Sequence, residues 1–258
     1  PGPQYEAPYG FIGAPVNYAM LARRYMHEYG EDRTRQAMAE IAVSTRKWAN
    51  LNPMAYFYDK TTSFDDYHDS RWVAWPFHLL DCCLVTDAGA AIVITTPERA
   101  RDAKNGSVTI LGAGEGHDHS MISQMPDLTR AFGRNTGPQA FEMAGVSHSD
   151  LDLAMIYDSF TYTVLVTLEN LGFCGPGEGP DFVASQRTAP GGDFPLNTNG
   201  GGLSYTHPGM YGIFTVVEAA RQLRGQAGDR QLDKCDLALA HGTGGLLSST
   251  GTVVLGAE

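Results

Sequence analysis

The sequence predicts an α/β fold in which helices cover a mixed sheet. Apolar residues at helical spacing run from Ile213 to Leu223, and short, mostly apolar runs such as Leu151–Tyr157 are typical of buried strands. The two patterns alternate along the second half of the chain, which is the order expected for a layered α/β domain. The chain has 258 residues, 43% of them hydrophobic and 18% charged, so it can form one large domain or two small ones.

The first 75 residues are expected to form a helical and aromatic region. Apolar residues recur at helical spacing from residue 11 to 30 and again from residue 31 to 50, and the patterns stop at Gly30 and before Pro53. They predict a helical hairpin. Residues 54–75 contain many aromatic side chains without a clear period. This composition suits an ordered loop beside a cleft or subunit interface, or a long loop whose aromatic side chains pack into the core.

Short apolar runs and helical patterns follow one another from residue 79 onward. The small apolar run of residues 82–95 precedes a short helix that opens at Thr96. The remaining expected elements are a strand at 108–113, a helix at 130–144 capped by Thr129, a strand at 151–157, a helix at 160–171, a loop at 175–193, a helix at 213–223 and strands at 237–240 and 251–255.

Charge and cysteine content limit the functional classes. The net charge is −11 and no run of Lys or Arg occurs, which argues against nucleic acid as a partner. No apolar run reaches the ~18 residues of a membrane span and no signal-peptide pattern is found, so a cytoplasmic location is expected. The cysteines lack CxxC spacing and are expected to be reduced, mostly buried thiols without a catalytic role, and no metal site or bound cofactor is expected. They are Cys82, Cys83, Cys174 and Cys235.

Polar residues follow the strands, where open α/β sheets bind ligands. Tyr157-Asp158 closes one strand, His241 closes another, and Tyr205 and His207 precede a helix beside the glycines at 200–202. Glycine lets the backbone approach a ligand, and neutral imidazole and phenol can move a proton to or from an oxygen near neutral pH. A structural hydrogen bond is the simpler role for any one of these side chains, so the predicted site depends on their convergence.

Four segments carry a resemblance to a known family: Asn199–Pro208, Glu218–Gly225, His241–Gly245 and Pro76–Ala91. The first three resemble the C-terminal half of the thiolase superfamily, in particular its sterol carrier protein x and lipid-transfer-protein branch. The last is similar to the strand pair that ends the N-terminal thiolase half. The resemblance implies a thiolase-like, layered α-β-α-β-α fold with mixed sheets.

The resemblance also implies a domain organisation. Residues 1–75 would form a helical and aromatic loop domain, residues 76–128 the end of the N-terminal thiolase half, and residues 129–258 the C-terminal half. Roughly the first third of the family's length would be missing, and with it the loop that carries the nucleophilic cysteine.

Departures from the thiolase pattern point to a different reaction. Thiolases of this branch have a His-Asp-Cys-Phe-like segment where this chain has Tyr157–Phe160, and Tyr205 lies two residues before His207 in place of a lysine or similar residue. His241 replaces the second thiolase cysteine, although some true thiolases also carry histidine there. No cysteine falls at a matching catalytic position, and Claisen chemistry needs a thiolate. The pattern resembles the steroid side-chain-cleaving aldolases.

This resemblance implies retro-aldol cleavage of a β-hydroxyacyl-CoA, with a steroid side chain as the acyl group, to a ketone and a shorter acyl-CoA such as propionyl-CoA. Tyr205 or Tyr157 would take the hydroxyl proton, and His207, together with His241, would hydrogen-bond the enolate oxygen. CoA would enter only as part of the substrate. The residues expected to bind the substrate are Asp158, Gly201, Gly202 and Gly244.

Two other functions stay open at this point. One is a degradative acyl-CoA thiolase whose nucleophilic cysteine lies in the missing segment, and the other is a non-catalytic, thiolase-like lipid-binding subunit. The resemblance further implies a homodimer and a small OB-fold partner with a zinc-ribbon-like segment, which accompanies an acyl-CoA hydratase.

Overall fold

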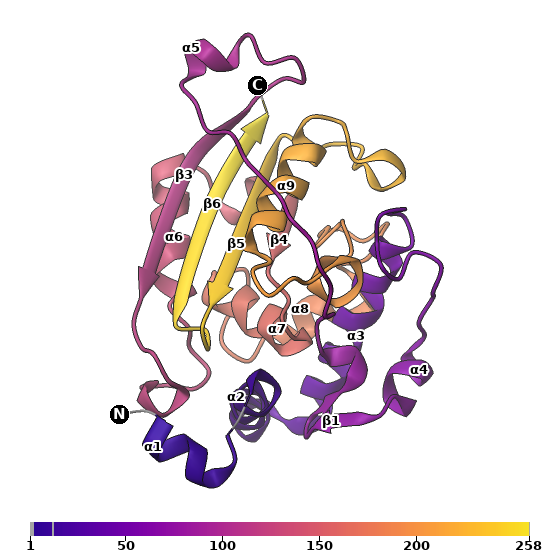
Figure 1. Cartoon of the computed structure of the whole chain (residues 1–258), viewed down its shortest axis with the longest axis vertical. Helices are drawn as coiled ribbons and strands as arrows, with labels where there is room; N and C mark the ends of the chain where they lie inside the picture. Colours follow the sequence, from indigo (N-terminus) through magenta and orange to yellow (C-terminus); the bar gives the residue numbers. More distant parts are fainter. Residues whose placement is uncertain (1–2, 12, 258) are drawn as a thin grey trace.

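The structure, a computed structural model, describes residues 3–11 and 13–257. Its main sheet has four strands in the order β3-β6-β5-β4 (Figure 1). Strands β4 and β5 are parallel, whereas β6 is antiparallel to both β3 and β5. The sheet is therefore mixed, as the sequence predicts. The strands are β3 (Val108–His117), β4 (Leu153–Ile156), β5 (Leu237–Gly244) and β6 (Ser249–Ala257).

Helices cover both faces of this sheet. Helix α6 (Gly133–Ala144) lies directly on β3, because a Cβ atom added at Gly112 would come within 2.1 Å of the Ala140 carbonyl oxygen. Helix α9 (Gly212–Leu223) covers the opposite face and packs Ala219 against apolar side chains of β4, β5 and β6 (Figure 1). The layered α/β arrangement follows from these two contacts.

The remaining elements lie in the first half of the chain and between β4 and α9. They are α1 (Pro3–Glu6), α2 (Ala14–Tyr29), α3 (Glu31–Ala49), α4 (Phe64–Asp69), α5 (Pro97–Ala100), α7 (Thr161–Asn170), α8 (Gly179–Val183) and the two-stranded antiparallel ribbon of β1 (Trp72–Ala74) and β2 (Phe77–His78). Short 3-10 turns connect several of them.

The predicted helical hairpin is confirmed as α2 and α3, which meet at Gly30 with a φ of 103°. Residue 12, part of the first expected helix, lies outside the described residues. Helix α3 is buried over most of its length and contacts α7 and α8. Its C-terminal end supports the chain before α9, because the Nε atom of Arg46 donates a hydrogen bond of 2.9 Å to the hydroxyl oxygen of Ser204.

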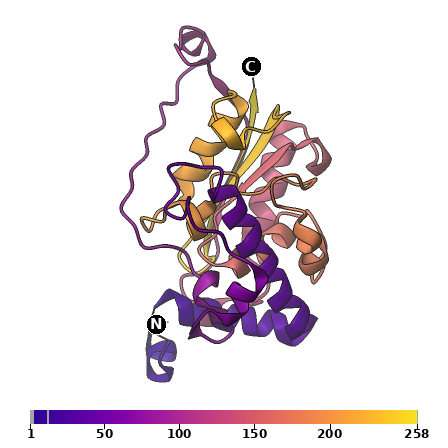
Figure 2. The same ribbon diagram turned by 90° about the vertical axis from the view of Figure 1, so that its right-hand side faces the viewer.

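The prediction of a strand pair within residues 76–91 is wrong for the residues that follow β2. After an isolated bridge between Cys82 and Phe160, residues 83–96 form an extended segment without a strand ladder in the described part of the chain. Figure 2 shows this segment bowing away from the body of the protein. Val85 and Val93 are 98% and 91% exposed. A strand requires a neighbouring strand to accept its backbone hydrogen bonds. In the described part of the chain the amides of Leu84 and Thr86 donate instead to the carbonyls of Gly202 and His207, which lie outside the strands.

Two helices also differ from the sequence expectation: one begins later than predicted, and one forms where a loop was predicted. Helix α6 begins at Gly133 instead of residue 130, because the amide and hydroxyl of Thr129 both donate to the Asp127 carboxylate and do not cap the helix. Within residues 54–75, expected to be a loop, α4 forms behind a reciprocal capping box of Ser63 and Asp66. A capping box satisfies two amide groups that the first helical turn leaves free.

Candidate active site

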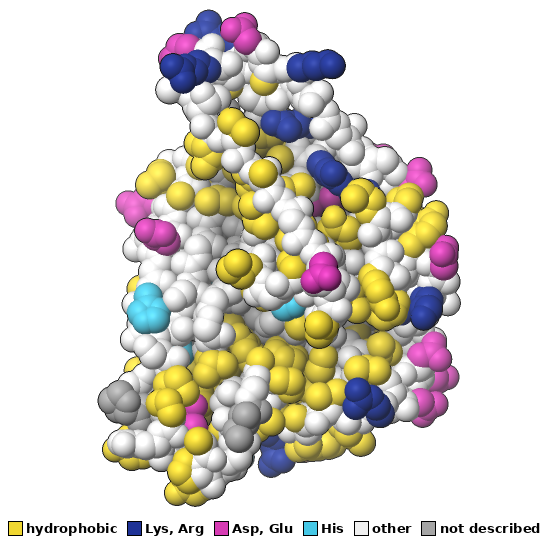
Figure 3. All heavy atoms as spheres, viewed as in Figure 1, with side chains coloured by type: hydrophobic (Ala, Val, Ile, Leu, Met, Phe, Trp, Pro, Cys, Tyr) yellow, Lys and Arg dark blue, Asp and Glu magenta, His cyan; other side chains and the backbone are white. Residues whose placement is uncertain are grey.

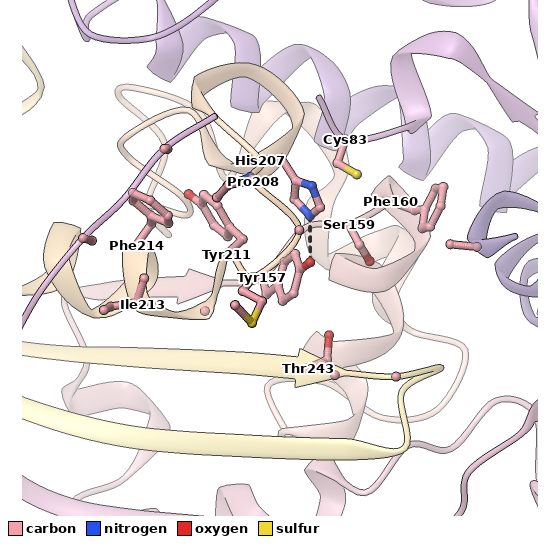
Figure 4. A pocket seen from close by; sticks show the side chains of 18 of the residues that line it. Cys83, Tyr157, Ser159, Phe160, His207, Pro208, Tyr211, Ile213, Phe214 and Thr243 are labelled. Carbon is pink, nitrogen blue, oxygen red and sulfur yellow. Dashed lines mark hydrogen bonds between the residues drawn. The ribbon is translucent and has the colours of Figure 1, made fainter. Parts of the chain in front are cut away.

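Three segments meet at one end of the sheet and enclose a cavity of about 880 Å³ (Figure 4). Residues 157–160 follow β4, residues 207–214 lead into α9, and residues 243–245 end β5. Tyr18 of α2 and residues 88–90 of the extended segment also line the cavity. The strand ends that the sequence predicts to converge therefore do so, within a mostly apolar wall.

Tyr157 and His207 form the polar centre of this cavity. The phenolic oxygen of Tyr157 lies 2.7 Å from Nε2 of His207, and the two rings point toward one another across the cavity wall (Figure 4). The ring of Tyr211 lies beside that of His207 at an interplanar angle of 18° and a centroid distance of 6.2 Å. The pair combines one proton donor with one acceptor, so it can relay a proton.

Burial keeps both members of the pair neutral. It raises the pKa of Tyr157 above its ordinary value, with smaller contributions from Cys83, Tyr18 and Asp158. Burial lowers the pKa of His207, against smaller opposing contributions from backbone hydrogen bonds. At neutral pH the site therefore holds a phenol and a neutral imidazole. When Nδ1 carries the imidazole hydrogen, Tyr157 donates its proton to Nε2.

Backbone hydrogen bonds fix the segment that carries His207. The amide of His207 donates to the Thr86 hydroxyl at 2.8 Å, and the amide of Thr86 donates to the carbonyl of His207 at 3.3 Å. The side-chain oxygen of Asn199 accepts hydrogen bonds from the Gly201 amide and the Tyr211 hydroxyl. The extended segment and the glycine stretch thus hold His207 from two sides.

Asp158 lies behind this segment instead of in the cavity wall. Its buried carboxylate accepts hydrogen bonds from the amides of Gly202 at 2.6 Å and Leu203 at 3.2 Å. Gly201 has a φ of 59°, and a Cβ atom there would lie 2.0 Å from the Asp158 carboxylate. Of the four residues expected to bind substrate, only Gly244 is among the described residues that line the cavity.

Tyr205 and His241 lie outside the described cavity lining. Tyr205 is half-buried, with its ring edge-on to Phe214 at 6.2 Å. His241 is 1% exposed, and its Nδ1 atom lies 2.8 Å from the Thr252 hydroxyl. Burial lowers the pKa of His241 to about 3, so this imidazole is neutral at physiological pH. The structure thus brings Tyr157 and His207 together but neither of the other two candidates.

We expect His241→Asn to remove an acid sensitivity of the fold. Below pH 6.5 the unfolded chain protonates His241, whereas the folded chain does so only near pH 3, so stability is lost as the pH falls through this window. The loss at pH 5 is about 2 kcal/mol. Asparagine can keep the hydrogen bond to Thr252. Urea unfolding of both proteins at pH 7 and pH 5 measures the difference, and equal pH dependence would contradict the assignment.

Two residues of the cavity carried weak sequence signals. Tyr211 follows His207 by four residues and is buried, yet glycine and proline between them hide any periodicity. Cys83 lines the cavity, although the sequence predicts only a buried thiol without a catalytic role. Burial raises the pKa of Cys83 to about 12, so it is a protonated thiol at neutral pH. Its place in the apolar run 82–95 was the only available signal.

Two negative findings hold for the described ranges 3–11 and 13–257. They contain no group of three or more His, Cys, Asp or Glu side chains that could hold a metal ion. They also contain no helix of the length and apolarity needed to cross a membrane. The four cysteines are free thiols.

Comparison with known proteins identifies relatives of this chain. The chain is 39% identical to the steroid side-chain-cleaving aldolase of Thermomonospora curvata, over 97% of this chain and 64% of that protein. It is 40% identical to the 17-hydroxy-3-oxo-4-pregnene-20-carboxyl-CoA lyase of Mycobacterium tuberculosis, over 86% of this chain and 58% of that protein. The chain therefore spans less than two thirds of the length of these relatives.

A solved structure and a family match complete the comparison. The structure named Ltp2-ChsH2(DUF35) aldolase superimposes with a TM-score of 0.92 at 35% identity, over 99% of this chain and 66% of that chain. Residues 114–257 match the family described as thiolase C-terminal domain-like, and these residues are more than half of the sequence. The protein is therefore a member of the thiolase family, and its second half forms the C-terminal thiolase domain.

Proposed function

We propose that this protein is a thiolase-fold aldolase that cleaves a β-hydroxyacyl-CoA, with a steroid side chain as its acyl group, into a ketone and a shorter acyl-CoA such as propionyl-CoA. The observation that carries the proposal is the hydrogen-bonded pair of Tyr157 and His207 in an apolar cavity. Similarity to two proteins named as steroid aldolase and lyase supports the substrate class. CoA enters as part of the substrate, and no further cofactor takes part.

The pair can perform each proton transfer of a retro-aldol reaction. Tyr157 accepts the proton of the substrate's β-hydroxyl while its own proton passes to Nε2 of His207. The oxygen electrons form the ketone carbonyl, the bond between Cα and Cβ breaks, and its electrons form the thioester enolate. The proton then returns from His207 through Tyr157 to Cα, which yields the shorter acyl-CoA. The enzyme ends in its initial state, and no covalent intermediate is needed.

The thiolase alternative fits the cavity less well. A thiolase holds the acyl group on a thiolate, which this alternative would have to draw from a segment outside the sequence. Cys83, which lines the described cavity, does not supply that thiolate at neutral pH, because burial raises its pKa to about 12. A non-catalytic lipid-binding subunit is also less favoured. Such a subunit has no physical need for a hydrogen-bonded pair of Tyr157 and His207 whose neutral forms suit proton transfer.

Exposed apolar side chains support the proposal that this chain binds a partner protein. Hydrophobic side chains gather across the middle of the face seen in Figure 3. Large apolar side chains that are exposed include Trp72 at 46% and Trp75 at 41%. The solved relative's name includes ChsH2(DUF35). This chain would act in the cytoplasm as a homodimer together with a small OB-fold and zinc-ribbon protein associated with an acyl-CoA hydratase.

A single assay separates these functions. The protein, with and without its candidate partner, is incubated with a β-hydroxyacyl-CoA that bears a tertiary hydroxyl, and the products are followed by mass spectrometry. We expect a ketone and a shorter acyl-CoA without added CoA. Cleavage of a β-ketoacyl-CoA that depends on free CoA would support the thiolase instead. If neither substrate is cleaved, the result would support the non-catalytic subunit.

A further inference from the structure

Asp158 is the buried carboxylate closest along the chain to the candidate catalytic pair, and the proposed mechanism does not use it. It directly follows Tyr157, and each of its two oxygens accepts a hydrogen bond from the turn at residues 201–205. We propose that Asp158 is a positioning residue that holds this turn so that His207 stays within hydrogen-bonding distance of Tyr157. The kinetic consequence rests on the proposed function, but the positioning does not.

The dipeptide Tyr157-Asp158 contacts both ends of one short segment. Tyr157 reaches His207 at 2.7 Å, whereas Asp158 reaches the amide of Gly202, five residues earlier, at 2.6 Å. At its start, this segment is also tied to the extended segment, because the Leu84 amide donates a hydrogen bond of 2.9 Å to the Gly202 carbonyl. Two adjacent residues thus fix the start and the end of residues 202–207, so a shift of the Asp158 carboxylate changes the position of His207.

The glycines of the turn fit this role better than contact with substrate. A Cβ atom at Gly201 would lie 2.0 Å from the Asp158 carboxylate, and one at Gly202 would lie 3.2 Å from it. The backbone therefore closes tightly on the carboxylate, and only glycine leaves room for it at residue 201. The close backbone approach that the sequence indicates is an approach to Asp158.

The positioning depends on the charge of Asp158. An ionised carboxylate accepts from both amides, whereas a protonated one presents a hydroxyl donor to an amide donor. Among the described residues, burial raises the pKa of Cys83, Tyr157 and Tyr211, and the charge of Asp158 helps to raise each of them further, so all three stay neutral at physiological pH. Burial raises the pKa of Asp158 to about 7, against the lowering effect of the Gly202 and Leu203 amides. The turn should therefore tighten as the pH rises through this value.

The first test compares Asp158→Asn with Asp81→Asn. Asp81 is an equally buried carboxylate, and its hydrogen bonds among the described residues come from Tyr67, Thr161 and the amide of His78 instead of the turn. Imidazole nitrogen NMR, assigned with a His207→Gln spectrum, reports the hydrogen bond of His207 without any substrate. We expect Asp158→Asn to shift the Nε2 resonance of His207 and Asp81→Asn to leave it in place. An unchanged resonance in Asp158→Asn overturns the proposal.

Kinetics adds a second readout. Because the turn should tighten as Asp158 ionises, we expect kcat of the wild-type protein to rise near pH 7. Asp158→Asn should remove this rise and lower kcat about 10- to 100-fold, with KM within about twofold. Asp81→Asn should keep that rise. If the wild-type protein cleaves no substrate, the proposed function fails while the NMR comparison still decides the positioning role.

A measurement on the wild-type fold covers the case in which Asp158→Asn does not fold. The His207 resonance is then followed from pH 5 to pH 8 in the wild-type protein and in Asp81→Asn. A step near pH 7 in both proteins, distinct from the protonation of His207 itself at lower pH, supports the proposal. Absence of that step overturns it.

Discussion

Tyr157→Phe should reduce turnover of the β-hydroxyacyl-CoA by roughly 10²- to 10⁴-fold, the usual contribution of a positioned acid–base group. The phenolic oxygen is the atom that contacts Nε2 of His207, and phenylalanine removes it while keeping the ring that packs on Tyr211 at 5.5 Å. Substrate binding should therefore survive. Single-turnover rates and the dissociation constant of a non-cleavable acyl-CoA analogue separate the two effects.

Two further tyrosines provide the controls. Tyr162→Phe removes a hydroxyl that is fully buried in α7 without a hydrogen-bond partner among the described residues, so it tests the effect of losing a buried hydroxyl away from the cavity. Tyr205→Phe tests the second tyrosine that the sequence offers as a base. Both should retain turnover. A loss of turnover in Tyr205→Phe with full activity in Tyr157→Phe would reverse the assignment of the base.

Most of the fold could be predicted because its elements carry local signals. Helices α2 and α3 show helical periodicity on either side of Gly30, and β4 is a short, continuous apolar run, as expected for a strand buried on both faces. Residues 83–96 carry an equally good strand signal and form no strand. Strand pairing is non-local, so the composition of one segment cannot report whether a neighbouring strand is present.

The sequence could predict where the candidate site lies, but not which of its side chains contact one another. Strand ends locate the cavity, whereas the pair of Tyr157 and His207 joins residues 50 positions apart. Only the three-dimensional path of the turn decides that Tyr157, and not Tyr205, reaches the imidazole. The glycines were ambiguous for the same reason, because close backbone approach to a ligand and to Asp158 leave the same sequence signal.

Gly201→Ala should both destabilise the fold and impair catalysis. The residue has a φ of 59°, which costs a non-glycine residue about 1–2 kcal/mol. The new methyl group would also lie 2.0 Å from the Asp158 carboxylate in a fully buried position, so the turn or the carboxylate must move. We expect a total loss of roughly 3 kcal/mol in the free energy of unfolding and a fall in kcat of about 100-fold, since a displacement of ~1 Å has such an effect.

Gly145→Ala is the matched control for this change. Gly145 ends α6 with a φ of 68°, and nothing lies within 4 Å of its added Cβ atom, so it carries the conformational cost without the collision. Urea unfolding should show a loss of only about 1–2 kcal/mol in this variant, with kcat unchanged. Equal losses of stability in the two variants would mean that the carboxylate of Asp158 moves aside without a cost in the free energy of unfolding. In that case the turn would not depend on it, and the role of Asp158 in holding His207 would be lost with it.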